Sequence, residues 1–164
     1  MKTLILVRHA KTEPIHSQIT DFDRNLLNKG INEAHFVSLK LLDKKIIPDL
    51  IVSSPARRAM ETAEIFASNF DYPKKNIEIN ELIYDHYTTN DFIKMMSGIN
   101  NKHDKVMVFG HNPSFEILAY RFTNEFNKHL PTTGMIGINF DVKSWKEIEA
   151  GKGKFHFFYH PKSI

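Results

Sequence analysis

Short apolar runs alternate with amphipathic helical patterns along this chain, and this alternation constrains the fold more than any other feature. Three runs predict buried strands because their central residues are apolar: residues 3–7 (TLILV), 49–53 (DLIVS) and 105–109 (KVMVF). Helical periodicity separates them, and strands that alternate with helices are typical of α/β domains with a mostly parallel sheet. We therefore expect a three-layer αβα domain, in which helices cover both faces of a mostly parallel central sheet.

The helical segments and the weaker strands complete this outline. Residues 54–70 carry apolar side chains at helical spacing, with Ser54 suited to cap the N-terminus and Pro55 suited to the first helical position. A later helix is opened by Pro113 and carries Phe126 on its apolar face. The last two strands alternate apolar and polar residues more clearly, so we expect them to be antiparallel or to lie at a sheet edge. The remaining predicted elements are helices over 28–46 and 91–96, and strands over 76–79, 136–142 and 154–159.

Composition narrows the function classes. The chain has 164 residues, a net charge of +3 and no cysteine. One domain over residues 1–164 is the simplest organisation for this length. The lack of cysteine excludes disulfides, thiolate nucleophiles and cysteine-based metal sites. Basic residues form no dense block and no apolar stretch is long enough to span a membrane, so we expect a cytoplasmic protein without nucleic acid or membrane partners. A mildly positive surface suits an anionic substrate.

Charged and polar side chains directly follow three of the predicted strands. Arg8 and His9 end the first apolar run, the segment 53–58 (SSPARR) ends the second, and the segment 110–113 (GHNP) follows the strand at 105–109. In an open parallel sheet the carboxyl ends of the strands share one edge, where ligands bind. Arginine recognises phosphate oxygens through paired hydrogen bonds, and helix N-termini favour anions. The sequence therefore predicts a phosphate site at this edge.

Each fragment also has an ordinary structural interpretation. His111 could be a turn residue whose ring bonds to nearby backbone, and Arg57 and Arg58 could begin a solvated helix. Helical periodicity does not decide which of the two arginines faces the site. The functional interpretation depends on three independent fragments that fall at the same end of one sheet.

The motifs LVRHAK, SSPARRAMETAE and FGHNP resemble, in order and spacing, the three motifs of the histidine phosphatase (phosphoglycerate-mutase-like) superfamily. They look most like its small phosphohistidine phosphatase branch, the SixA type. The stretch DFDRNLLNKG resembles a further segment of that branch. The resemblance extends from Met1 to about Phe122 and implies a phosphoglycerate-mutase-like fold.

The resemblance also implies roles for individual residues. His9 would be the nucleophile that is transiently phosphorylated, and Arg8 would bind the phosphoryl oxygens beside it. Arg58, rather than Arg57, matches the second arginine of the family, because it stands directly before alanine in the RAxxTA pattern. His111, in its protonated form, would contact the transferred group from the opposite side.

Other positions are less closely matched to the family pattern. Many members carry a glutamate that protonates the leaving oxygen; Glu81 and Asp85 are the candidates here, but neither stands in the usual sequence context. Both could equally be solvated loop carboxylates. Four further residues are candidates for phosphate binding or for the rim of the site: Asn112, Arg24, Arg57 and Lys11.

The residue types are consistent with phosphoryl transfer. A neutral imidazole attacks phosphorus near neutral pH without a separate base, and arginines stabilise the phosphoryl charge. No dense cluster of metal-ligating residues stands in the sequence, so we expect neither a metal nor another cofactor. Only about 25 residues separate Glu81 from the strand at 105–109. This leaves little chain for a lid and predicts a shallow, open site.

These features together predict a metal-independent histidine phosphatase that acts on phosphohistidine of a phosphorelay or phosphotransfer-type protein. A phosphoramidate substrate suits a site without a clear acid, because imidazole leaves more readily than an alkoxide. Two alternatives stay open: a small-molecule phosphomonoesterase of the same fold, and a non-catalytic phosphate-binding module. The presence of His9, Arg58 and His111 argues against the module, because binding alone needs no nucleophile.

Overall fold

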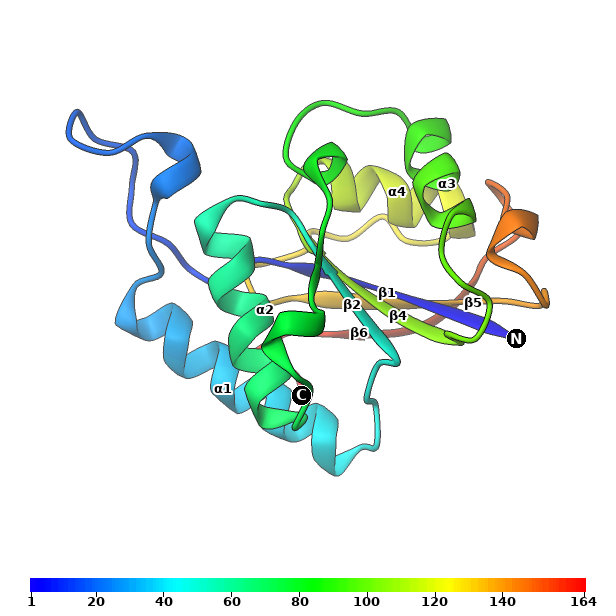
Figure 1. Cartoon of the computed structure of the whole chain (residues 1–164), viewed down its shortest axis with the longest axis horizontal. Helices are drawn as coiled ribbons and strands as arrows, with labels where there is room; N and C mark the ends of the chain where they lie inside the picture. The colour runs from blue at the N-terminus through cyan, green and yellow to red at the C-terminus, as the bar shows by residue number, and fades with distance from the viewer.

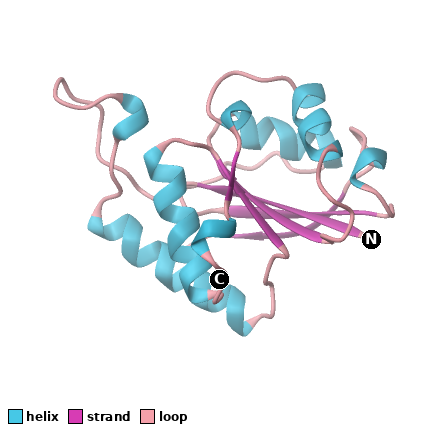
Figure 2. Ribbon diagram, viewed as in Figure 1, coloured by secondary structure: helices cyan, strands magenta, loops and turns pink.

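A six-stranded mixed sheet separates two layers of helices (Figure 1). The structure is a computed structural model and describes residues 1–164. Helices α1 and α2 cover one face of the sheet and α3 and α4 cover the other, so the expected three-layer α/β architecture is confirmed (Figure 2). The strands are β1 (Lys2–Arg8), β2 (Leu50–Ser53), β3 (Glu78–Ile79), β4 (Lys105–Gly110), β5 (Met135–Phe140) and β6 (Lys154–Tyr159). The helices are α1 (Asn28–Asp43), α2 (Arg57–Asn69), α3 (Thr89–Ser97) and α4 (Ser114–Thr123).

The strand order is β3-β2-β4-β1-β5-β6, and the first four strands in this order are parallel. β5 pairs with β1, and β6 with β5, in antiparallel orientation. The prediction that the last two strands are antiparallel or at an edge is confirmed. Because β1, β2 and β4 are parallel, their carboxyl ends lie at one edge of the sheet, as the phosphate-site prediction requires.

The central strand β1 is buried on both faces, which explains its unbroken apolar run. Leu4 and Leu6 belong to the core cluster under α3 and α4, while Ile5 and Val7 belong to the cluster under α1 and α2. All four side chains are fully buried. Between Leu4 and Val7, where a core covers each side, the strand has no position for a polar residue.

The helices are of ordinary length for a globular domain. The longest, α1, has 16 residues and ends at Asp43, a little earlier than its apolar pattern suggested. No helix combines the length and the apolar composition needed to cross a membrane.

Two helix ends differ from the sequence prediction. α2 begins at Arg57 after an N-cap at Ala56, so the predictions of Ser54 as the N-cap and of Pro55 as the first helical residue are wrong. The Ser54 hydroxyl instead accepts the N–H of Ala56 at 3.2 Å in the turn before the helix. α4 ends where Asn124 adopts a left-handed conformation, and Phe126 is buried from the loop beyond rather than from the helix face. Apolar spacing did not reveal this end because Phe126 packs on the same core.

We expect Gly110→Ala to lower the free energy of unfolding by about 1–3 kcal/mol, because overpacking forces neighbouring groups apart. A Cβ at Gly110 would lie 2.5 Å from Cζ of Phe115 and 2.7 Å from Cγ2 of Ile83. Urea denaturation followed by circular dichroism measures the change. Gly98→Ala is the control, because a Cβ there meets only the carbonyl of Met95, at 3.4 Å. Equal losses in the two variants would contradict the packing argument.

Candidate active site

The parallel register of β1 and β4 brings the two predicted histidines together. Arg8 pairs with Gly110 across the ladder, and the N–H of His9 donates to the Gly110 carbonyl at 3.0 Å. His111 follows directly, and the ring centroids of His9 and His111 are 5.3 Å apart. The two side chains therefore lie side by side at the carboxyl edge of the sheet.

Local hydrogen bonds fix the tautomer of His9. Its Nδ1 lies 2.8 Å from the carbonyl oxygen of Ala10. Because a carbonyl only accepts, Nδ1 carries the proton and Nε2 keeps a free lone pair. The N–H of Ala10 donates to the Thr62 hydroxyl at 2.9 Å, which ties this turn to α2. Burial lowers the pKa of His9 to about 4. The hydrogen bond to Ala10 raises this pKa, whereas the positive charges of Arg58 and Arg8 lower it further. The ring is therefore neutral near neutral pH.

His111 is positioned by Ser54, the residue that the sequence pattern placed at a helix cap. The Ser54 hydroxyl lies 2.8 Å from Nε2 of His111, while Nδ1 is buried without a partner in the protein. Burial lowers the pKa of His111 to about 3, assisted by the positive charge of Arg58. The expected protonated form of His111 is thus not the form that this environment favours. A phosphoryl dianion beside the ring would oppose the shift.

Arg58 lies in the site and Arg57 lies outside it. The Arg58 side chain is only 7% exposed, and its guanidinium donates to the carbonyl and the carboxylate of Asp21 at 2.8 and 3.2 Å. The Arg57 side chain is 57% exposed and pairs with Glu61 along α2 at 3.0 Å. The RAxxTA pattern of the family therefore identified the arginine that faces inward, which helical periodicity could not do.

Buried donors without partners gather at this edge. Arg8 donates to the carbonyl of Leu130 at 3.0 Å, but its Nε is buried without a partner. The same holds for Nε of Arg24 and of Arg58, and for Nδ1 of His111. Native proteins leave few buried polar atoms unsatisfied, and a bound ion or water is a common explanation. A concentration of such donors is what a phosphoryl anion needs.

Asp21, which motif analysis did not select, connects these groups. It lies in the short helix η1 (Asp21–Asp23) and accepts a hydrogen bond from the hydroxyl of Tyr84 at 3.0 Å, besides those from Arg58. It also pairs with Arg24 at 2.9 Å. Burial alone would raise the pKa of Asp21, but Tyr84 and the two arginines together lower it, so the carboxylate is ionised. The sequence signal was the DFDRNLLNKG stretch, which begins at this residue.

The structure does not bring Glu81 and Asp85 into the site. Both are exposed, and the Asp85 carboxylate accepts the next backbone N–H at 2.7 Å. Between them, Tyr84 turns toward Asp21, and its ring lies 5.9 Å from that of His111. Neither predicted acid makes a hydrogen bond or ion pair with a residue of the site.

The remaining rim candidates have different surroundings. Asn112 lies behind Arg8, where its amide donates to Glu116 at 2.8 Å and to the carbonyl of Leu130 at 2.9 Å. This bonding orients the loop that also holds the Arg8 guanidinium. Lys11, two residues after His9, is exposed.

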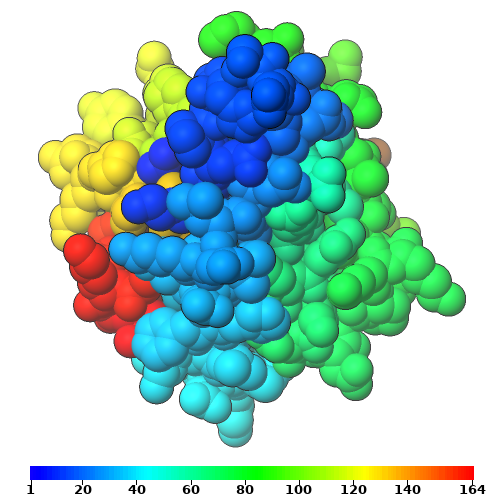
Figure 3. Space-filling view, turned by 90° about the vertical axis from the view of Figure 1, so that its left-hand side faces the viewer, coloured from blue at the N-terminus to red at the C-terminus, as the bar shows by residue number.

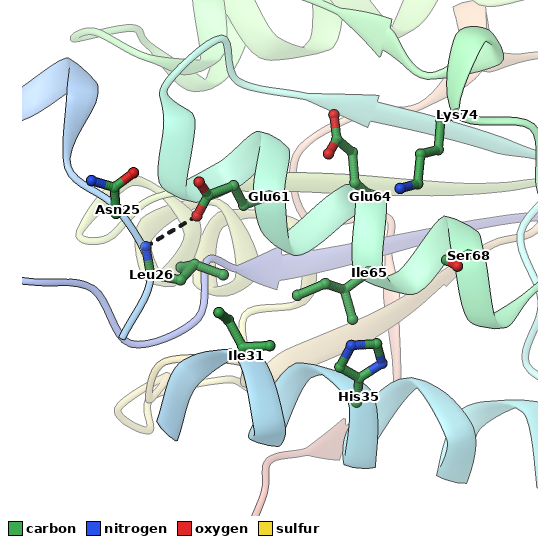
Figure 4. Close-up of a pocket in the computed structure, with 9 residues that line it drawn as sticks. All are labelled: Asn25, Leu26, Ile31, His35, Glu61, Glu64, Ile65, Ser68 and Lys74. Carbon is green, nitrogen blue, oxygen red and sulfur yellow. Dashed lines mark hydrogen bonds between the residues drawn. The ribbon is translucent and has the colours of Figure 1, made fainter. Parts of the chain in front are cut away.

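Glu61 anchors the segment that follows η1. Its Oε2 accepts the N–H of Leu26 at 3.0 Å, at one end of a groove between α1 and α2 (Figure 4). The groove has a volume of about 470 Å³, and no residue predicted for the site lines it. The Glu61 contact ties to α2 the segment that carries Asp21 and Arg24.

The site is more enclosed than the sequence predicted. His9, Arg58 and His111 are exposed by 6%, 6% and 9%. Part of the cover comes from the segment between β1 and α1, which reaches Arg58 through Asp21 and forms the blue surface at the top of Figure 3. The expectation of a shallow, open site considered only the chain after Glu81, and it is wrong for this reason.

The arrangement suits transfer of a phosphoryl group to an imidazole. It combines a neutral ring with a free nitrogen, the buried guanidinium group of Arg58, the half-buried one of Arg8 and a second neutral ring at one edge of the sheet. Preorganised cations stabilise the charge that spreads over the equatorial oxygens of phosphorus. No group of three or more His, Asp and Glu side chains is placed to hold a metal ion.

Comparison with known proteins identifies a family and one partial relative. The model of the histidine phosphatase superfamily (branch 1) matches residues 4–92. The mitochondrial serine/threonine-protein phosphatase Pgam5 of Drosophila grimshawi is 31% identical over 75 residues. This alignment covers 46% of the chain but only 25% of that relative.

Solved structures share the fold over nearly the whole chain. The protein histidine phosphatase SixA complexed with tungstate has a TM-score of 0.83 at 18% identity, covering 98% of this chain and 97% of that one. A SixA protein from Agrobacterium tumefaciens has a TM-score of 0.80 at 24% identity, covering 98% of both chains. A phosphoserine phosphatase mutant from Entamoeba histolytica, in complex with phosphoserine, has a TM-score of 0.65 at 17% identity and is covered completely. The expected phosphoglycerate-mutase-like fold is thereby confirmed.

We expect His9 and His111 to remain neutral down to about pH 5, because their pKa values are lowered to about 4 and about 3. Histidine ring NMR signals followed through an acid titration measure this, and the variants His9→Gln and His111→Gln each identify the signals of the ring that they remove. The unfolded chain takes up these protons first, so the free energy of unfolding should fall as the pH drops from about 6.5 toward 4. Rings that titrate near 6.5 would contradict the proposed environment.

Arg58→Ala should reduce kcat/KM and the affinity for orthovanadate by about a hundredfold, because a charge-assisted double contact to the phosphoryl group is lost. Arg57→Ala should change both by less than about threefold, because only an exposed ion pair is removed. Steady-state kinetics and inhibition constants measure the two effects. Similar losses in the two variants would show that the inward-facing arginine has been wrongly chosen.

Proposed function

Because the chain belongs to the histidine phosphatase superfamily, branch 1, we propose that it removes the phosphoryl group from phosphohistidine on a protein. The proposed route passes through a phosphohistidine intermediate on His9. The substrate would be a signalling protein of the phosphorelay or phosphotransfer type.

The ionised state of Asp21 carries this proposal. Asp21 is the carboxylate in direct contact with Arg58 and Tyr84, and these partners lower its pKa. A carboxylate held in this way has no proton to give to a leaving group. Glu81 and Asp85 are exposed, and neither makes a hydrogen bond or ion pair with His9, Arg58 or His111. An alkoxide needs protonation as it leaves, whereas imidazole leaves without a strong acid, so these surroundings favour a phosphoramidate over an ester.

The first chemical step transfers phosphorus to His9. The Nε2 lone pair attacks, the P–N bond of the substrate breaks, and the electron pair of that bond leaves with the substrate imidazole, which takes its proton from water. The bond from Nδ1 of His9 to Ala10 holds the ring in the tautomer that attacks. Arg8 and Arg58 would bind the equatorial oxygens, and Nδ1 of His111 is free to bond to the same group.

Water completes the reaction. A water molecule attacks phosphorus, the P–N bond to His9 breaks, and inorganic phosphate leaves while the ring regains its free lone pair. The low pKa of His9 supports this cycle, because the ring does not wait for deprotonation before the next attack.

The second candidate is hydrolysis of a small-molecule phosphate ester. The burial of His9 and His111 favours it, because a small substrate fits an enclosed site more easily than a protein does. A non-catalytic phosphate-binding module is supported less well, since binding alone does not require a free Nε2 on His9.

We expect kcat/KM for a phosphohistidine peptide to exceed that for a matched phosphoserine peptide and for sugar phosphates by at least about tenfold, because imidazole is the better leaving group. Glu81→Gln and Asp85→Asn should leave turnover within about threefold, since neither carboxylate contacts the site. Phosphate release measured over this substrate series tests both statements.

His9→Ala provides the control for the series. Rapid quenching after incubation with labelled substrate should trap an acid-labile phosphoryl group on the natural sequence and none on this variant. A sugar phosphate as the best substrate, with a loss of several orders of magnitude in Glu81→Gln or Asp85→Asn, would establish the ester hydrolase instead.

A further inference from the structure

A second group of charged residues lies beside the site, at the carboxyl end of β1. A cavity of about 240 Å³ opens there, and none of its lining residues is hydrophobic. Three parts of the chain meet around it: the residues after β1 with the start of α1, the loop before β5, and the turn after β6. Figure 3 shows this face, on which the blue, yellow and red segments converge. The lining includes Lys11, Lys29, Glu33, Thr132, His160 and Lys162.

The cavity carries an excess of positive charge. Three lysines, Lys11, Lys29 and Lys162, face one acidic residue, Glu33, so two positive charges are unopposed. Glu33 lies 3.8 Å from the ammonium group of Lys29, which leaves the other two lysines without an ion pair. Both are exposed and free to meet a ligand.

Backbone contacts connect this cavity to His9. Lys11 is two residues farther along the chain, so the two Cα atoms lie within about 7 Å of each other. The N–H of Thr133, one residue beyond the lining threonine, lies 3.2 Å from the carbonyl oxygen of His9. The start of α1 reaches Lys11 because Gly30 has no side chain; a Cβ there would collide with the Lys11 carbonyl. The cavity and the predicted nucleophile are therefore held close together.

A hydrogen bond and core packing also hold the turn after β6 in place. The N–H of Ser163 donates to the carbonyl of His160 at 2.9 Å, and Ile164 packs on the core cluster under α1 and α2. The backbone N–H of Lys162 lies 3.3 Å from Nδ1 of His160. This turn presents the Lys162 side chain at the cavity.

We propose that this cavity is a subsite for a carboxylate side chain of the substrate, an aspartate or glutamate close to the phosphohistidine of the protein. The inference rests on the proposed function, since it specifies which phosphohistidine proteins the site prefers. The substrate protein would then carry an acidic surface around its phosphohistidine.

The residue types favour a carboxylate over a second phosphate. The lining contains lysines but no arginine, and lysine acts as a mobile point charge rather than as a planar fork that grips phosphate. The lining holds no Phe, Tyr or Trp on which a nucleobase could stack, and its apolar side chains are those of Pro131 and Pro161. Exposed lysines of this kind attract an acidic surface and orient its approach, so they act on binding more than on the chemical step.

The test uses two peptides of equal length with one phosphohistidine each, one with glutamates beside it and one with glutamines there. The natural sequence should hydrolyse the glutamate peptide with the lower KM and an unchanged kcat, and raised salt should reduce this preference. Lys162→Glu should remove the preference and lower kcat/KM for the glutamate peptide by about tenfold.

Lys75→Glu is the matched control, because it makes the same change in net charge at an exposed position in η2 (Lys74–Asn76), after the end of α2. It should keep the preference. Equal KM values for the two peptides, or equal losses in the two variants, would overturn the subsite while leaving the phosphohistidine activity standing. Lack of turnover of both peptides and of free phosphohistidine would instead overturn the proposed function, and the subsite with it.

Inorganic pyrophosphate as an inhibitor distinguishes the source of the anion. Its inhibition constant should not depend on Lys162 if the cavity takes a protein carboxylate. Weaker inhibition in Lys162→Glu, without any preference between the peptides, would assign the cavity to a second phosphate and overturn the proposal.

Discussion

The parallel pairing of β1 with β4 is the constraint on which the whole site depends. It places Arg8 opposite Gly110, so the residue after each strand is a histidine and the two rings come within 5.3 Å. A slip by one residue would turn one ring to the other face of the sheet. The cores on both faces of β1 prevent such a slip, because Leu4 and Leu6 would exchange places with Ile5 and Val7.

Burial and neighbouring charges then determine which side chains of the site are neutral and which are charged. Low exposure keeps both histidines neutral, whereas the guanidinium groups of Arg8 and Arg58 stay charged in the same space. Asp21 balances part of this charge and, with Tyr84, holds Arg58 in place. The result is a cationic pocket beside an imidazole whose lone pair is free.

The sequence was most informative where chemistry must follow a strand directly. His9 and His111 are next to strand ends, so the alternation of elements and the motif order were enough to bring them together. The choice of Arg58 over Arg57 needed the RAxxTA pattern of the family. Prediction failed where contacts between distant segments determine the role of a side chain. The Ser54 hydroxyl lies 2.8 Å from Nε2 of His111, after β4, and does not cap α2.

By itself, the sequence determined the fold class, the edge of the sheet that carries the site, and the residues that chain connectivity places there. Tertiary structure decided the rest: the enclosure by the segment after β1, the contact of Asp21 with Arg58 and Tyr84, and the exposure of Glu81 and Asp85. The physical reason is the distance along the chain between the residues that interact. Strand burial and helical periodicity are local patterns that one segment reveals, whereas a side-chain hydrogen bond between residues 37 or 63 positions apart exists only after the chain has folded.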